Sequence, residues 1–170
     1  MIKEFFSRKG GQRKYRAQAM VEFAIALPVL LALLVGIMEV GRMVIMYTLV
    51  VNSSREAARY ASAYGRTDSG YLRYKYCDGI KATANQTAYL AKLTSITIKY
   101  DQGPSDTTTN MSCTYSGGED TSVTAGTGWR VTVTVTADYK PMVKLLPIKS
   151  QTFTAKSSRT ILGVYSLPNP

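Results

Sequence analysis

Apolar residues are concentrated in one tract near the amino terminus of the 170-residue chain. Phe23–Met38 is a run of 16 consecutive uncharged residues, and more apolar sequence follows as far as Val51. A helix needs roughly 20 apolar residues to cross a bilayer, so the run is slightly short by itself. Its flanks complete a span if Glu22 and Glu39 lie near the two membrane interfaces or find partners. The pattern therefore predicts a membrane-spanning helix.

Helical spacing continues beyond this tract, in the stretch TLVVNSSREAARYASAYG. The residues that recur at the helical period are Ala57, Ala58, Tyr60 and Ala61. We therefore expect one helix from about Gln18 to Tyr64, with Gly65 as its C-cap, whose second half is amphipathic and packs on a globular part. Pro28 removes one backbone hydrogen bond from this helix, so we expect a kink there.

The sequence from residue 66 to residue 170 predicts a small α+β domain. Cys77–Leu93 has apolar residues at helical spacing. The predicted strands are SITIKY at 95–100, WRVTVTVTADY at 129–139 and QTFTAKSSRTIL at 151–162. Asp101–Gly128, between the first two strands, has too few large apolar residues for a core of its own and is expected to be a long surface loop. The predicted fold class is α+β, with a long, partly transmembrane amino-terminal helix packed on a three- or four-stranded antiparallel sheet.

Positive charge is concentrated ahead of the apolar tract. Residues 1–17 hold six Lys or Arg against one acidic residue, Glu4, so this basic leader carries half of the net charge of +10. The positive-inside bias places the leader in the cytoplasm and the sequence after Arg42 outside it. A cleaved secretory signal is the alternative, but the apolar tract is longer than usual and no small-x-small cleavage site follows it at once.

The composition argues against catalysis and against a bound cofactor. The chain has no His, the commonest general base and metal ligand, and shows no nucleophile paired with a base. Cys77 and Cys113 cannot fill a tetrahedral zinc site alone. Outside the cytoplasm they are expected to form one disulfide, and two free thiols in a reducing compartment are the alternative.

Two other groups of residues carry weaker signals. Acidic residues crowd the predicted loop without the spacing of a calcium loop: Asp101, Asp106, Glu119 and Asp120. We expect no metal site there.

YLRYKY, Tyr71–Tyr76, interleaves aromatic and basic residues and could bind single-stranded nucleic acid. Such runs are more often surface or subunit-contact strips, so we expect no nucleic acid as a partner.

The stretch QAMVEFAIALPVLLALLVGIMEVGRM, followed by SREAARYAS, resembles the amino-terminal region of TadE-like proteins. These are pilin-related subunits of tight-adherence, or type IVc, pilus systems. The resemblance is dense over 16–63 and looser over 131–147. It implies a leader that a prepilin peptidase removes, and a Glu as the fifth residue of the mature chain. Counting back from Glu22 gives a mature chain that begins at Gln18 and a cut after Ala17, where the family usually has Gly.

The resemblance also implies a role for Glu22 and the adjoining Phe23 in assembly. Removal of the leader creates an α-amino group, which on one subunit can neutralise the Glu22 carboxylate of its neighbour. A buried charge is tolerated when paired and costly when alone. The alternative is that Glu22 lies at the membrane interface and is solvated by head groups.

The function implied by the resemblance is structural. The chain would be a minor pilin or pseudopilin, rather than the major filament subunit, in a pilus for surface attachment or secretion. It would cross the cytoplasmic membrane once, with its domain outside. The implied partners are other pilin or pseudopilin subunits, the prepilin peptidase, the inner-membrane assembly platform and membrane lipid. A membrane-anchored module that binds a ligand and never polymerises is the alternative function.

Overall fold

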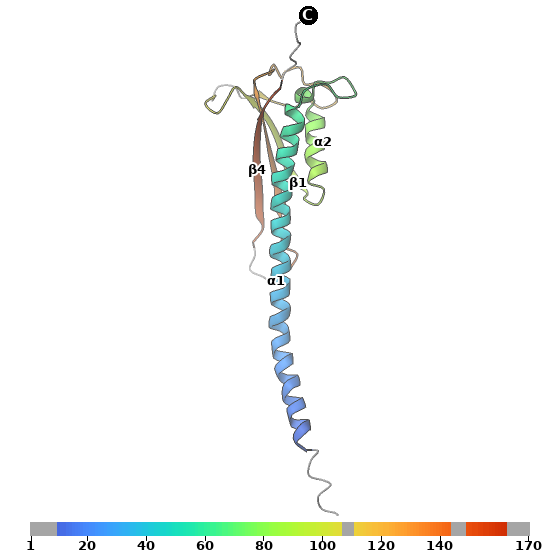
Figure 1. The fold of residues 1–170 in the computed structure, drawn as a ribbon, viewed down its shortest axis with the longest axis vertical. Coiled ribbons are helices and arrows are strands. Elements are labelled where there is room, and N and C mark those ends of the chain that lie inside the picture. Colours follow the sequence, from blue (N-terminus) through green and yellow to red (C-terminus); the bar gives the residue numbers. More distant parts are fainter. Residues whose placement is uncertain (1–9, 107–110, 144–148, 163–170) are drawn as a thin grey trace, which may run out of the picture. The chain divides into compact units, whose positions relative to one another are not determined.

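A computed structural model describes residues 10–106, 111–143 and 149–162 of the chain. Its elements are helix α1 (Gly10–Ser62), the 3₁₀ turn η1 (Arg73–Lys75), helix α2 (Cys77–Thr87) and strands β1 (Leu93–Asp101), β2 (Met111–Ser112), β3 (Arg130–Tyr139) and β4 (Gln151–Thr160) (Figure 1). The chain divides into two units, the first formed by residues 1–42 and 142–147 and the second by residues 43–141 and 148–170. The predicted α+β class, with a long amino-terminal helix and a small antiparallel sheet, is confirmed.

The sheet of the second unit has the order β2-β1-β3-β4, with every neighbouring pair antiparallel. Strand β3 is central, because Val133 lies opposite Ile98 of β1 and opposite Ser157 of β4. The alternation of valine and threonine along β3 puts Val131, Val133 and Val135 in the core. All three strands predicted from the sequence are therefore confirmed, with small differences at their ends.

The core of the second unit lies between this sheet and two helical segments. Its helical residues are Ala57, Ala58 and Ala61 from α1 and Ile80 and Ala84 from α2. The two helices run side by side in Figure 1, and the buried hydroxyl of Ser53 donates a hydrogen bond to the carbonyl of Ala84 at 2.7 Å. The amphipathic second half expected for the long helix is thus present, and small residues let the helices approach closely.

The bounds of α1 differ from the expected Gln18–Tyr64. The helix is already formed at Gly10, because the residues between Gly11 and Gln18 are mostly good helix formers and contain no proline or capping signal. It ends at Ser62, where the amide of Ala63 is shared between the carbonyls of Arg59 and Tyr60. Gly65 does adopt a positive φ of 102°, but it lies past the helix end rather than directly at it.

The second helix is shorter than the expected Cys77–Leu93. It ends at Thr87, and the chain turns at Ala88, whose carbonyl accepts a hydrogen bond from the amide of Ala91. Leu93 belongs instead to β1, where it pairs with Ala137 of β3. Pairing within the sheet has overridden the helical spacing of the last residues.

The prediction of a surface loop at Asp101–Gly128 is wrong in part. Within it, β2 adds a fourth strand beside β1, and the amide of Cys113 continues this pairing by donating to the carbonyl of Ile98. Val123 and Ala125 are buried in the core of the second unit. The segment is too poor in apolar residues for its own core, but a few small apolar side chains suffice to join an existing one.

Candidate functional site

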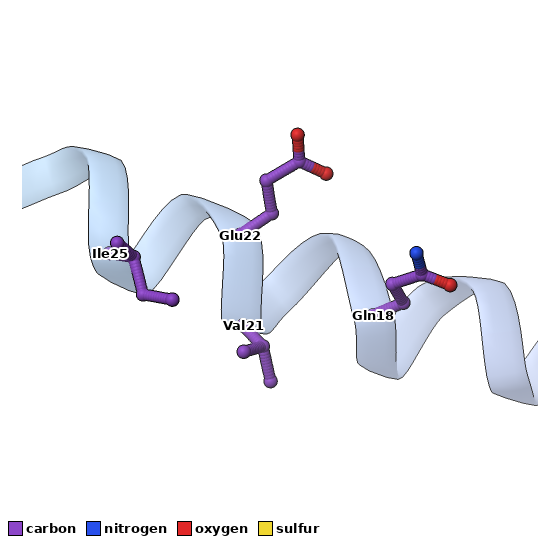
Figure 2. Close-up of a pocket in the computed structure, with 4 residues that line it drawn as sticks. All are labelled: Gln18, Val21, Glu22 and Ile25. Atoms are coloured by element: carbon purple, nitrogen blue, oxygen red, sulfur yellow. The ribbon is translucent and has the colours of Figure 1, made fainter.

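The predicted processing and assembly residues lie in the first unit, inside α1. Gln18 and Glu22 are one helical turn apart, and Figure 2 shows their polar ends on the same side of the helix while Val21 extends to the other side. These three residues and Ile25 line a shallow hollow on the helix surface. The turn therefore presents a carboxylate and the residue predicted to become the new amino terminus on one face.

Glu22 and Phe23 are both exposed on this helix. Within the part of the chain that the structure describes, the Glu22 carboxylate has no hydrogen-bond or ion-pair partner. Its neighbours along the helix are almost entirely apolar and are exposed as well. The arrangement leaves an acidic side chain open to a group from outside the subunit.

The helix that carries these residues is suited to a membrane. By length and composition, one helix of the described residues could cross a bilayer, Gln18–Ser62, and its most apolar 18-residue window has a mean hydropathy of 2.5 with none of it buried. This segment is compatible with a single-pass anchor. Helix α1 continues through Pro28, and the kink expected there stays a prediction.

A second carboxylate of the first unit, Glu39, is buried and has partners, whereas Glu22 is exposed. Glu39 is 3 % exposed, its carboxylate lies 3.3 Å from the guanidinium of Arg42, and it accepts a hydrogen bond from the backbone N–H of Met142 at 2.8 Å. The sequence marked Glu39 as a carboxylate at the end of the span that would need a partner. It gave no sign that this partner would include a residue 103 positions away.

The predicted disulfide between Cys77 and Cys113 is present, with the two Cα atoms 5.6 Å apart. It joins the amino terminus of α2 to the residue after β2, and both cysteines are buried. The disulfide therefore ties the 101–128 segment to the helical side of the second unit.

Asp120, one of the four acidic residues noted in the 101–128 segment, lies beside this disulfide. It is 3 % exposed and lies 3.7 Å from the Cys77 sulfur. Its carboxylate accepts hydrogen bonds from the hydroxyl and amide of Ser122 and from the amides of Thr114 and Tyr115. These bonds, chiefly the one from the Ser122 hydroxyl, lower the pKa of Asp120 to about 2 although burial opposes the shift.

We expect Asp120→Asn to lower the free energy of unfolding by about 2 kcal/mol at pH 7. Because the pKa of Asp120 is lowered in the folded state, its contribution is present above about pH 4 and is lost as the pH falls to about 2. Urea unfolding at both pH values measures this difference. The exposed Asp68 provides the control, since Asp68→Asn should cost less than about 0.5 kcal/mol throughout. An equal loss for Asp120→Asn at pH 7 and pH 2 would contradict the account.

The other acidic residues of the suspected cluster are held in separate contacts. Asp101 forms an ion pair with Arg130 at 2.6 Å, and Glu119 lies 3.4 Å from Arg66. Asp106 accepts a hydrogen bond from the amide of Gln102. Among the described residues, the only group of three side chains close enough to share a metal is Cys77, Cys113 and Asp120, and the disulfide occupies both sulfurs.

The Tyr71–Tyr76 strip packs into the second unit. The Tyr100 hydroxyl donates a hydrogen bond to the carbonyl of Tyr74, and the Arg73 guanidinium lies 5.4 Å from the centre of the Tyr60 ring. Tyr71 and Tyr76 contact one another, with ring centres 5.3 Å apart. These contacts give the strip a structural role in the second unit.

Comparison with known proteins agrees with the resemblance seen in the sequence. The model of the family described as TadE-like protein matches residues 17–59, about a quarter of the chain. The matched part includes Glu22, Pro28 and Glu39 and ends inside the packed half of α1. Searches of curated proteins and of solved structures gave no match.

Proposed function

We propose that the chain is a minor pilin or pseudopilin that takes part in assembly of a tight-adherence (type IVc) pilus, for surface attachment or secretion. The TadE-like match suggests involvement in the Tad pilus system. The observation that carries the finer proposal is Glu22, an exposed carboxylate without a partner among the described residues, set in an apolar helix that could span a membrane. Its role would be structural rather than catalytic.

The charge of Glu22 favours the assembled state over the free subunit. An unpaired carboxylate deep in lipid costs roughly 2.5 to 3.5 kcal/mol on insertion scales. Cleavage after Ala17 would create an α-amino group at Gln18, and that group on a neighbouring subunit could pair with Glu22. Pairing removes most of the cost of the isolated charge. The charge therefore favours association between spans only when the α-amino group and the carboxylate form an ion pair.

The proposed topology follows from the charge of the leader. Residues 1–17 stay on the cytoplasmic side, where the prepilin peptidase and the inner-membrane assembly platform would act, and the disulfide-linked second unit lies outside. The Cys77–Cys113 disulfide supports this side for the second unit, because disulfides persist in oxidising compartments.

Co-purification tests the proposal. The chain with an affinity tag, isolated in mild detergent from the membranes of the cells that make it, should bring other pilin or pseudopilin subunits with it. An unrelated single-pass membrane protein with the same tag controls for adhesion to the apolar span. Recovery of the chain alone, at normal abundance, would overturn the proposal and favour a binding module that does not polymerise.

A further inference from the structure

Oxygen atoms lie close to both sulfurs of the Cys77–Cys113 disulfide. The Asp120 carboxylate is 3.7 Å from the Cys77 sulfur, and the carbonyl oxygen of Lys75 is 3.8 Å from each of the two sulfurs. We propose that the negative charge of Asp120 protects the disulfide from reduction by thiols in the folded chain. The inference concerns the second unit alone and does not depend on pilus assembly.

Reduction of a disulfide by a thiol proceeds through two exchange steps. In the first, a thiolate attacks one sulfur and forms a mixed disulfide with that cysteine, while the S–S bond breaks and the other cysteine leaves as a thiolate. In the second, another thiolate attacks the reductant's sulfur in the mixed disulfide. This step releases the remaining cysteine and joins the two reductant molecules as a disulfide. Because the transition state of the first step carries a negative charge, a carboxylate beside the sulfurs raises its barrier.

Asp120 is charged and has no cationic partner among the described residues. Its pKa of about 2 keeps it ionised at neutral pH. Its hydrogen-bond donors are a neutral hydroxyl and backbone amides, and it takes part in none of the ion pairs of the described part of the chain. Because Asp120 is only 3 % exposed, water screens its charge less than that of a surface carboxylate.

The position of Cys77 would by itself make the disulfide easier to reduce. Cys77 is the first residue of α2, and a helix amino terminus, which carries about half a positive charge, stabilises a thiolate there. The Asp120 carboxylate places a full negative charge beside the same sulfur, so its effect outweighs that of the helix terminus. Unfolding separates the cysteines from Asp120, so the protection is confined to the folded chain.

Two thiol reductants of different charge test the inference with the full chain in a neutral detergent. Cysteamine carries an ammonium group and mercaptoethanesulfonate carries a sulfonate, so the Asp120 charge should favour the first and repel the second. Rates of the first exchange step are measured by mass spectrometry after acid quenching, and each is divided by the thiolate fraction of the reductant.

The informative quantity is the ratio of the cysteamine rate to the mercaptoethanesulfonate rate. The intrinsic reactivities of the two thiols cancel when this ratio is compared between variants. We expect the ratio to be about tenfold larger in the wild-type chain than in Asp120→Asn. Asp68→Asn removes the same net charge at an exposed position and should keep the wild-type ratio. Equal ratios in the wild-type chain and Asp120→Asn, or an equal fall in Asp68→Asn, would overturn the inference.

Ser122→Ala separates the charge of Asp120 from the packing of its segment. The substitution removes the hydroxyl that donates to Asp120 but leaves the carboxylate in place. If the segment loosens, both reductants should act faster by the same factor, and the ratio should stay within about twofold of the wild-type value. A ratio that falls as far as in Asp120→Asn would show that loosening, rather than charge, controls the reduction.

The effect of salt tests the inference in the wild-type chain without any substitution. The chain has a net charge of +10, which by itself would attract mercaptoethanesulfonate, and salt would then slow this reductant. If the Asp120 charge dominates at the disulfide, salt screens a repulsion instead. We therefore expect the mercaptoethanesulfonate rate to rise with salt, and a fall would contradict the inference.

Discussion

Glu22→Ala is expected to leave the chain in the membrane at wild-type abundance or above and to abolish its co-purification with other pilin subunits. In the free subunit, the substitution removes a charge that has no partner among the described residues. The isolated span should then become more soluble in lipid, by up to roughly 2.5 to 3.5 kcal/mol if the site is deep.

In the assembled state the same substitution is expected to be destabilising. The α-amino group of the neighbouring subunit would lose its counter-ion, and deleting one partner of a buried pair costs about 3 to 5 kcal/mol. Glu22→Gln should behave in the same way, because it keeps the size of the side chain and removes only the charge.

The matched control is Glu56→Ala on the same helix. The Glu56 carboxylate is 42 % exposed and forms a surface ion pair with Arg59, which contributes little to stability. It should change neither membrane abundance nor co-purification. Normal abundance together with normal co-purification of Glu22→Ala would show that Glu22 is only an interfacial residue.

Replacing both Cys77 and Cys113 by Ala is expected to lower the free energy of unfolding of the second unit by about 4 kcal/mol. The disulfide spans a sequence separation of 36, and the loss of a cross-link of that length frees the unfolded chain by roughly this amount in the entropy model. Strand β2 lies within the loop that the disulfide closes and ends directly before Cys113.

Urea unfolding of the full chain in detergent, with and without a thiol reductant, measures this effect. Reductant should destabilise the wild-type chain to nearly the level of the double variant, and the double variant should not respond to reductant. If the two proteins have the same midpoint without reductant, the disulfide does not stabilise the second unit.

Features encoded within a few neighbouring residues were predictable from the sequence. The alternation of Val131, Val133 and Val135 with threonines predicted the central strand, because successive side chains of a strand point to opposite faces of the sheet. The cysteine pair was predictable from the count of two and the proposed compartment. The ends of the helices were harder to predict from the sequence. Gly10–Ala17 is helical in accord with its helix propensity, whereas Leu93 lies in β1 because it pairs with Ala137.

Features that depend on distant contacts could not be predicted. Glu39 and Met142 are 103 positions apart, and no local pattern specifies their hydrogen bond. Asp120 was grouped with other acids by proximity in sequence, whereas the fold surrounds it with amide donors beside the disulfide. For Glu22 the position was clear from the sequence, and the partner that we propose for it belongs to a neighbouring subunit.

The intact mass of the chain that co-purifies with other pilin subunits shows whether the leader is removed before assembly. Assembly through Glu22 requires the α-amino group that cleavage after Ala17 creates, so the account predicts a mass for residues 18–170 with the Cys77–Cys113 disulfide formed. A co-purifying chain that still carries residues 1–17 would contradict it, because the amino group proposed to pair with Glu22 would not exist.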